Sequence, residues 1–285
     1  MASAPGSCGE LVQGKIEGQN FHITCPIDLY SRARVEIQRS KEIVYPAGKP
    51  KAREAMRKTL DLFDGKNWGG RLEIFSDIPI AKGMASSTAD IAAASLATAL
   101  ALGKEVTPDH ISSIALSIEP TDGIMYEGIV LYDHLKRGLV EKLGLSPPVS
   151  IIILEPEERL ETMVYNNGRP AYGEVEELLF ERAVEIIRKG LKERDGQAIG
   201  QVATMSATIN QKYLAKPLFE PVLNLAQVRG ALGVNVAHSG TVMGILCDPE
   251  KTETAELLTD LYHLLPPGVK VRWKKLVGGG ARVGW

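Results

Sequence analysis

Residues 79–89 constrain the fold of this chain more than any other stretch. They read Pro-Ile-Ala-Lys-Gly-Met-Ala-Ser-Ser-Thr-Ala, after an apolar strand pattern at 71–75 and at the start of an alanine-rich helical pattern at 86–102. A glycine and small hydroxyl residues at a strand-to-helix junction direct backbone N–H groups and the positive helix end toward one point. This geometry suits an anion, for which a nucleotide phosphate is our interpretation; an ordinary helix N-cap is the alternative.

The composition narrows the classes of function. The chain has 285 residues with 33 basic and 35 acidic side chains and no run of Lys or Arg, which argues against nucleic acid as a partner. Its three cysteines are widely spaced, and neither C-x-x-C nor H-E-x-x-H occurs, so no disulfide framework or structural zinc site is indicated. The N-terminus lacks a leader pattern and the longest apolar run is too short to span a bilayer. We therefore expect a cytoplasmic protein with no membrane partner.

The order of patterns is that of an α+β protein. Strands are predicted at 11–17, 21–25, 31–38, 71–75, 149–154, 234–237, 242–247 and 269–274, with a turn at Pro26. Helices are predicted at 52–62, 86–102, 108–118, 175–192, 198–210, 219–229 and 253–264, with a weaker one after Gly138. The loop at 155–169 predicts a division into an N-terminal domain at 1–160 and a C-terminal domain at 161–285.

Three segments rich in small residues resemble the three motifs of the GHMP kinase superfamily, which includes galactokinase, homoserine kinase and mevalonate kinase. They lie at 4–11, 79–89 and 236–244, in the family's order and spacing. The second follows the pattern Pro-x-x-x-Gly-Leu-Gly-Ser-Ser-x-Ala, with Met84 for Leu and Ala85 for Gly. Pro-Gly-Ser-Cys-Gly-Glu-Leu-Val-Gln-Gly at 5–14 and Glu-Pro-Thr-Asp-Gly at 119–123 resemble the L-threonine kinase branch, which makes O-phospho-L-threonine for the aminopropanol linker of cobalamin.

The resemblance implies a two-domain fold and a set of nucleotide contacts. The N-terminal domain would be like the second domain of ribosomal protein S5, and the C-terminal domain would be ferredoxin-like. ATP would lie at the second motif, and the acceptor alcohol would lie between the domains. The implied ATP-binding residues are Pro79, Gly83, Met84, Ala85, Ser86, Ser87, Thr88 and Ala89. Lys82 beside the loop could bind a phosphate, with a solvated lysine as the alternative.

Two carboxylates flank a predicted turn at Pro120. The proline favours a turn, so Glu119 and Asp122 would lie within about 7 Å of each other and could reach one cation. Magnesium commonly takes one or two carboxylates and completes its shell with water and phosphate oxygens. The resemblance implies that Ser87 and Glu119 hold Mg²⁺ and that Asp122 is the catalytic residue facing the acceptor hydroxyl. Several relatives separate these two acids by about a helical segment, so their division of roles stays open, and a solvated turn is the alternative.

Further residues are candidates for contact with the acceptor. Glu10 and Asp28 could bind an amino group, with surface charge or turn capping as the alternative. Cys8 lacks a base partner in the sequence, and we expect it to pack beside the site. The third motif contributes His238, Ser239, Gly240 and Thr241.

Threonine phosphorylation is the leading functional hypothesis, with ATP and L-threonine as small-molecule partners. Homoserine kinase or another GHMP-type kinase is the nearest alternative, and a nucleotide-binding regulator without turnover is a different class. No G-x-x-x-x-G-K-[ST] or G-x-S-x-G occurs, which disfavours a P-loop NTPase and a serine hydrolase. The region 43–68 is where we expect the adenine pocket, and the sequence leaves a homo-oligomer open.

Overall fold

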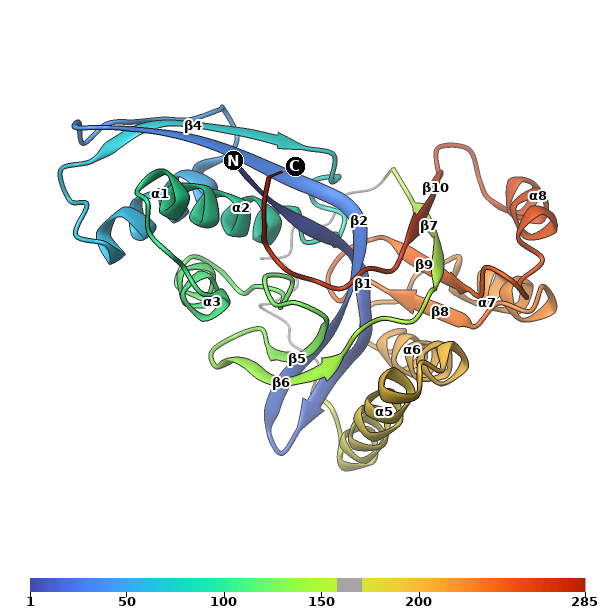
Figure 1. Ribbon diagram of the computed structural model, residues 1–285. Helices are drawn as coiled ribbons and strands as arrows, with labels where there is room; N and C mark the ends of the chain where they lie inside the picture. The colour runs from blue at the N-terminus through green and yellow to red at the C-terminus, as the bar shows by residue number, and fades with distance from the viewer. Residues whose placement is uncertain (158–170, 285) are drawn as a thin grey trace.

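A long antiparallel pair formed by the first two strands organises the fold. The computed structural model describes residues 1–157 and 171–284. Strands β1 (Ala2–Ile16) and β2 (Gln19–Gln38) are joined at Glu17 and Gly18, both with positive φ. They occupy the middle of one sheet in the order β10-β7-β9-β8-β1-β2-β4-β3 (Figure 1). The two chain ends lie side by side because Ala2 pairs with Val283 on β11.

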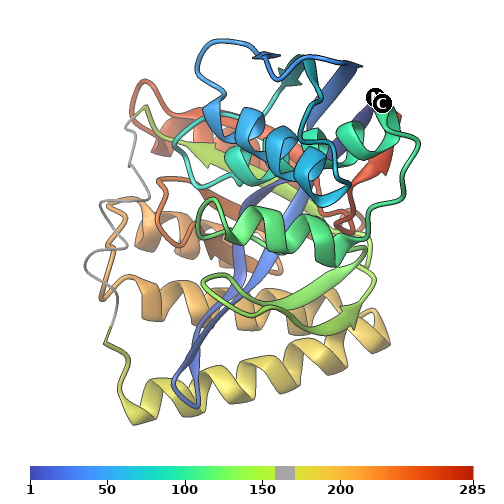
Figure 2. The same ribbon diagram turned by 90° about the vertical axis from the view of Figure 1, so that its left-hand side faces the viewer.

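The other elements follow along the chain as short runs of strands and of helices, the mixed order expected of an α+β protein. The remaining strands are β3 (Ile43–Val44), β4 (Gly69–Ser76), β5 (Ile129–Asp133), β6 (Gly138–Gly144), β7 (Ser150–Glu155), β8 (Gly233–Val236), β9 (Met243–Cys247), β10 (Lys270–Lys275) and β11 (Arg282–Val283). The helices are α1 (Pro50–Leu62), α2 (Ser86–Ala101), α3 (Pro108–Leu116), α5 (Glu174–Glu193), α6 (Gly196–Asn210), α7 (Phe219–Val228) and α8 (Thr254–Leu264). Figure 2 shows α1, α3 and α5 one above another, and Figure 1 places α1 and α3 to the left of the β1–β2 pair and α5 to its right.

The predicted elements are confirmed apart from two local errors. The helix expected after Gly138 is wrong, because this segment is β6, which pairs with β5 in a hairpin. The Asp133 carboxylate accepts the N–H groups of Leu135 and Lys136, and Gly138 has a φ of +77°, so a closed turn leads directly into a strand. The turn expected at Pro26 is also wrong: β2 continues through this residue, which lies opposite Ser7 beside an irregularity in the register.

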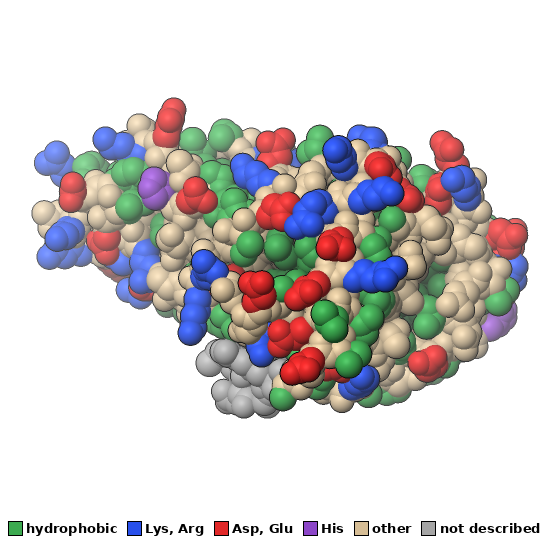
Figure 3. Space-filling model, turned by 90° about the horizontal axis from the view of Figure 1, so that it is seen from below, with side chains coloured by type: hydrophobic (Ala, Val, Ile, Leu, Met, Phe, Trp, Pro, Cys, Tyr) green, Lys and Arg blue, Asp and Glu red, His purple; other side chains and the backbone are tan. Residues whose placement is uncertain are grey.

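Strands from both parts of the chain share the sheet. β8 meets β1 at the pair Val236 and Glu10, and β7 lies between β9 and β10. The predicted domain division near residue 160 falls in 158–170, outside the described residues, and it stays a prediction. Within the described part of the chain, no helix has the length and apolarity needed to cross a bilayer. Lys and Arg are interspersed with Asp and Glu on the face in Figure 3, without a continuous basic patch.

Helix α5 is fixed to the central hairpin by one aromatic side chain. Phe180 is fully buried, and its ring meets the rings of Phe21 and Tyr172 edge to face, with centroids 6.2 Å and 5.0 Å away. Gly14 of β1 permits this approach, since a Cβ atom there would lie 2.5 Å from the Phe180 ring. The packing of α5 on β1 therefore depends on the large Phe180 ring lying against Gly14, which has no side chain.

We expect Phe180→Ala to lower the free energy of unfolding by about 3–5 kcal/mol, because it leaves a cavity against Gly14. Urea unfolding followed by circular dichroism measures this change. Leu178→Ala on the same helix is the matched control, since Leu178 is 63% exposed and should change the stability by less than about 0.5 kcal/mol. Equal effects of the two substitutions would contradict the packing role of Phe180.

Candidate active site

A cavity of about 400 Å³ opens where the three glycine-containing motifs meet. Its walls come from the start of α2, the turn after α3, and the strands β1 and β2. The residues that line it are Glu10, His22, Lys51, Ile80, Ala81, Gly83, Met84, Ala85, Ser86, Ser87, Thr88, Glu119, Pro120, Thr121, Asp122, His134, His238 and Ser239.

The loop before α2 lines this cavity and has an unusual backbone conformation. Ala81, Gly83 and Ala85 all adopt positive φ, at +60°, +80° and +54°. Alternation of right-handed and left-handed backbone conformations produces concavities that bind anions. Helix α2 begins at Ser86, and its N-cap residue Ala85 provides no side-chain hydrogen bond. The first N–H groups of α2 are thus left without a side-chain cap, which suits a bound phosphate.

Backbone hydrogen bonds join this loop to the first strand. The Ser7 N–H donates to the Met84 carbonyl at 3.0 Å, and the Gly9 N–H donates to the Gly83 carbonyl at 3.3 Å. Gly9 itself has a φ of +56°, and a Cβ there would lie 2.5 Å from the backbone of Ala237. The first and second motifs therefore form one backbone unit.

The third motif completes this unit from the other side. The N–H groups of Thr241 and Val242 both donate to the Lys82 carbonyl, at 3.1 Å and 3.2 Å. A Cβ at Gly83 would lie 2.5 Å from the Ala237 side chain and 2.8 Å from the Cα of Gly240. Glycine is required at position 83 because the loop packs directly against Ala237 and Gly240 of the third motif.

A set of oxygen donors lies at the N-terminus of α2. The Ser87 hydroxyl donates to Glu119 Oε1, and Lys51 Nζ lies 2.5 Å from Glu119 Oε2. Thr121 donates to the Thr88 hydroxyl at 2.9 Å, which attaches the turn to the helix. A hydroxyl and a carboxylate beside an anion-binding loop are the donors that a hard cation such as Mg²⁺ prefers, so these residues fit that ion.

The carboxylates of Glu10 and Asp122 lie on either side of His22 in the same cavity. His22 Nδ1 donates to Asp122 Oδ1 at 3.3 Å and lies 3.8 Å from Glu10 Oε1. Burial raises the pKa of Asp122 to about 6. Burial, and then the charge of Asp122, raise the pKa of Glu10 well above its ordinary value. Burial lowers the pKa of His22 to about 3, so this imidazole is neutral at neutral pH.

The fold and sequence have known counterparts. Residues 50–127 match the GHMP kinases N terminal domain. The chain is 32% identical to the L-threonine kinase of Salmonella typhimurium over 99% of its own length and 95% of that protein. It is 33% identical to the L-threonine kinase of Citrobacter freundii over 87% of this chain and 86% of that one. The chain belongs to the GHMP kinase family, in the L-threonine kinase branch.

Solved structures show that this GHMP kinase shares the fold of its family. A mevalonate kinase structure matches with a TM-score of 0.75 at 19% identity, covering 98% of this chain and 99% of the other. Homoserine kinase from Cytophaga hutchinsonii matches with a TM-score of 0.70 at 18% identity, covering 99% and 96%. The prediction of a small-molecule kinase with a GHMP kinase fold is confirmed.

The structure brings most of the predicted site residues of this kinase together and leaves others outside the cavity. Asp28 accepts the backbone N–H of Lys275 at 2.8 Å and does not line the cavity. Lys82 is buried, and its ammonium donates to the carbonyl groups of Pro156 and Glu157. Pro79 and Ala89 flank the cavity without lining it.

The remaining predicted contacts of the kinase lie behind the cavity, beside it or in its wall. Cys8 is fully buried, and its carbonyl accepts a hydrogen bond from Asn235 Nδ2. Burial raises the pKa of the Cys8 thiol, which keeps it protonated. Gly240 and Thr241 line a neighbouring cavity, whereas His238 and Ser239 line the first one.

Sequence reasoning missed three residues of this site. His22, His134 and Lys51 enter the cavity from β2, from the residue after β5, and from the first turn of α1. None belongs to a recognised motif, and their spacing along the chain carries no signal, because the pairing of β2 with β5 and the placement of α1 bring them together.

We expect Gly83→Ala to weaken the binding of an ATP analogue at least tenfold, because the added methyl group clashes with Ala237 and Gly240. Isothermal titration calorimetry measures the affinity. Gly103→Ala is the control: its φ is also positive, at +65°, but no atom lies within 4 Å of the added Cβ. It should share the backbone strain of about 1–2 kcal/mol and keep the nucleotide affinity. Unchanged affinity in Gly83→Ala would exclude this loop as the nucleotide site.

Proposed function

We propose that this kinase transfers the terminal phosphoryl group of ATP to the side-chain hydroxyl of L-threonine, giving O-phospho-L-threonine. The observation that carries the proposal is the cavity that joins the loop before α2 to the partly buried carboxyl of Asp122. Two L-threonine kinases that are similar over most of their length support the choice of acceptor.

The nucleotide would bind with its phosphates against the loop that precedes α2. Ser87 and Glu119 are the residues that would hold Mg²⁺, whose charge offsets that of the phosphate oxygens when the ion is bound. Lys51 is 47% exposed at its side chain and pairs with Glu119. Its flexible stem can carry the ammonium from this carboxylate to a phosphate oxygen. These roles rest on the geometry of the loop and on the family motif.

Asp122 would act as the base. With a pKa of about 6, it is about ten-to-one ionised at pH 7 and can accept the proton of the threonine hydroxyl. The hydroxyl oxygen forms its bond to phosphorus as the bond to the leaving ADP oxygen breaks, and the proton passes to Asp122 Oδ. His22 Nδ1–H donates to Asp122 and holds the carboxylate in position. Positioning dominates phosphoryl transfer, because the transition state is loose.

Glu10 would bind the ammonium group of the acceptor. Its carboxyl is 95% buried, and Oε2 has no hydrogen-bond partner among the described residues. An ammonium would supply that partner and favour the ionised carboxylate. Acceptor oxygens of Glu10 and Asp122 lie within 4.8 Å of each other. This short separation fits an amine and a hydroxyl on adjacent carbon atoms, as in threonine, better than the longer separation in homoserine.

The proposed cellular role comes from the resemblance to the L-threonine kinase branch. We propose that the product supplies the aminopropanol linker of cobalamin and that the reaction takes place in the cytoplasm. The three cysteines are buried and unpaired, which fits a reducing compartment.

The pH dependence tests Asp122. Its protonated form cannot accept a proton, so kcat should rise with pH through about pH 6 and level off above pH 7. Asp122→Asn should lower kcat by about 10²–10⁴-fold and leave the affinity for ATP within twofold. Coupled ADP release measures the rate, and Asp61→Asn, at an exposed position on α1, is the control. An unchanged kcat in Asp122→Asn would remove this residue from the mechanism.

An acceptor screen tests the substrate. Magnesium-dependent ADP formation should be fastest with threonine among threonine, serine, homoserine and mevalonate. Glu10→Gln should raise the KM for threonine at least tenfold with a smaller change in the KM for ATP, because only the ammonium contact is weakened. Glu105→Gln, an exposed matched change, should alter neither constant. Silence with threonine and turnover of another alcohol would overturn the acceptor, and silence with all of them would favour the regulator.

A further inference from the structure

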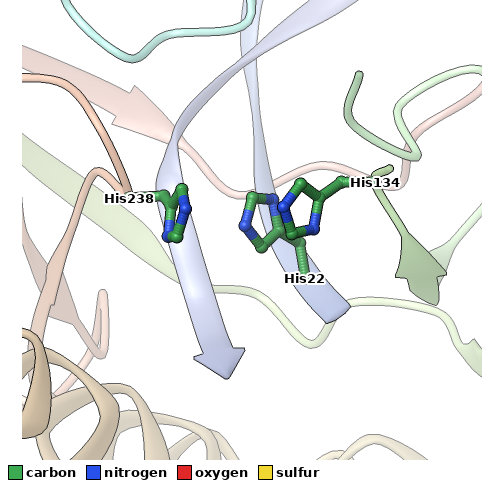
Figure 4. Close-up of side chains that lie close together, drawn as sticks. All are labelled: His22, His134 and His238. Carbon is green, nitrogen blue, oxygen red and sulfur yellow. The ribbon is translucent and has the colours of Figure 1, made fainter. Parts of the chain in front are cut away.

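Three of the five histidines of the chain converge at the deep end of the cavity (Figure 4). The rings of His22 and His134 are stacked with centroids 3.7 Å apart and planes at 9°. The ring of His238 faces them, with centroids 4.5 Å from His22 and 5.5 Å from His134. One ring nitrogen from each histidine lies within 4.8 Å of the others.

Hydrogen bonds set the tautomers of two of these rings. His22 Nδ1 donates to the Asp122 carboxylate, and His238 Nδ1 donates to the amide oxygen of Gln13. Each ring therefore carries its lone pair on Nε2. An imidazole that donates one N–H to a carboxylate or another oxygen and presents the other nitrogen is the usual arrangement around a bound metal.

His22 has a buried ring nitrogen that could bind a cation. This side chain is 96% buried, and its Nε2 has no hydrogen-bond partner within the described residues. A buried acceptor without a partner costs free energy, which a bound ion would recover.

We propose that His22, His134 and His238 form a binding site for one divalent transition-metal ion of the zinc class. Imidazole nitrogens suit Zn²⁺, Co²⁺ and Ni²⁺, whereas Mg²⁺ prefers oxygen donors such as Ser87 and Glu119. Three histidines leave a fourth position of a tetrahedral ion open toward the cavity.

Coordination makes a specific structural demand on the cluster. Zn–N bonds of about 2.0–2.1 Å place tetrahedral donor atoms roughly 3.4 Å apart. The ring nitrogens must therefore approach from their present separations, and one of the stacked rings must turn so that its lone pair meets the ion.

Metal binding to the full-length protein, purified without a polyhistidine tag, tests the site. Titration calorimetry with Zn²⁺ and visible absorption with Co²⁺ should show one ion per chain, and anomalous diffraction should place it among the three rings. His134→Ala should weaken binding by more than the ~10–100-fold that loss of an outer-shell partner costs. His263→Ala on α8 is the control, because this exposed histidine should have no effect.

His134→Gln serves as a second variant, and circular dichroism of both variants establishes that they fold. Wild-type affinity in the folded variants, an ion located elsewhere, or no binding of Zn²⁺ and Co²⁺ would each overturn the proposal. These binding measurements involve neither ATP nor an acceptor, so they are independent of the proposed kinase reaction.

Discussion

The backbone hydrogen bonds around residues 82–84 are the constraint on which the rest of the site depends. Carbonyl groups of Lys82, Gly83 and Met84 accept N–H groups from the first strand and from the turn after β8. The loop consequently keeps positive φ even at Ala81 and Ala85, where an L side chain makes that conformation costly. Because its carbonyl groups are engaged with neighbouring chain segments, the start of α2 can direct its N–H groups into the cavity.

Burial of polar groups produces the chemistry of this cavity. Asp122, Glu10 and His22 lie in one low-dielectric region, so the carboxyl groups hold their protons to higher pH and the imidazole loses its proton at lower pH. A carboxyl with a pKa of about 6 is a better proton acceptor at neutral pH than an exposed aspartate. Glu10 Oε2 and His22 Nε2 have no hydrogen-bond partner among residues 1–157 and 171–284, which costs free energy that a bound ligand can recover.

Two sets of donors with different preferences share the cavity. The pair Ser87 and Glu119 provides oxygen at the start of α2, close to the anion-binding loop. The histidine cluster provides nitrogen at the deep end, beside Asp122. A hard ion and a borderline ion would therefore distribute themselves between the two ends according to ligand type, without a difference in charge.

The sequence by itself determined the α+β class, the start of α2 at Ser86, and the meeting of three glycine-containing motifs that identify the family. These features depend on local sequence patterns and on glycine residues, which are needed where two backbones approach closely. The tertiary structure alone decided that β6 is a strand, that Asp28 lies outside the cavity, and that three histidines converge. The strand β6 forms because it can pair with β5, and the other two features depend on how segments far apart in the chain are placed, about which a side chain's spacing along the sequence carries no information.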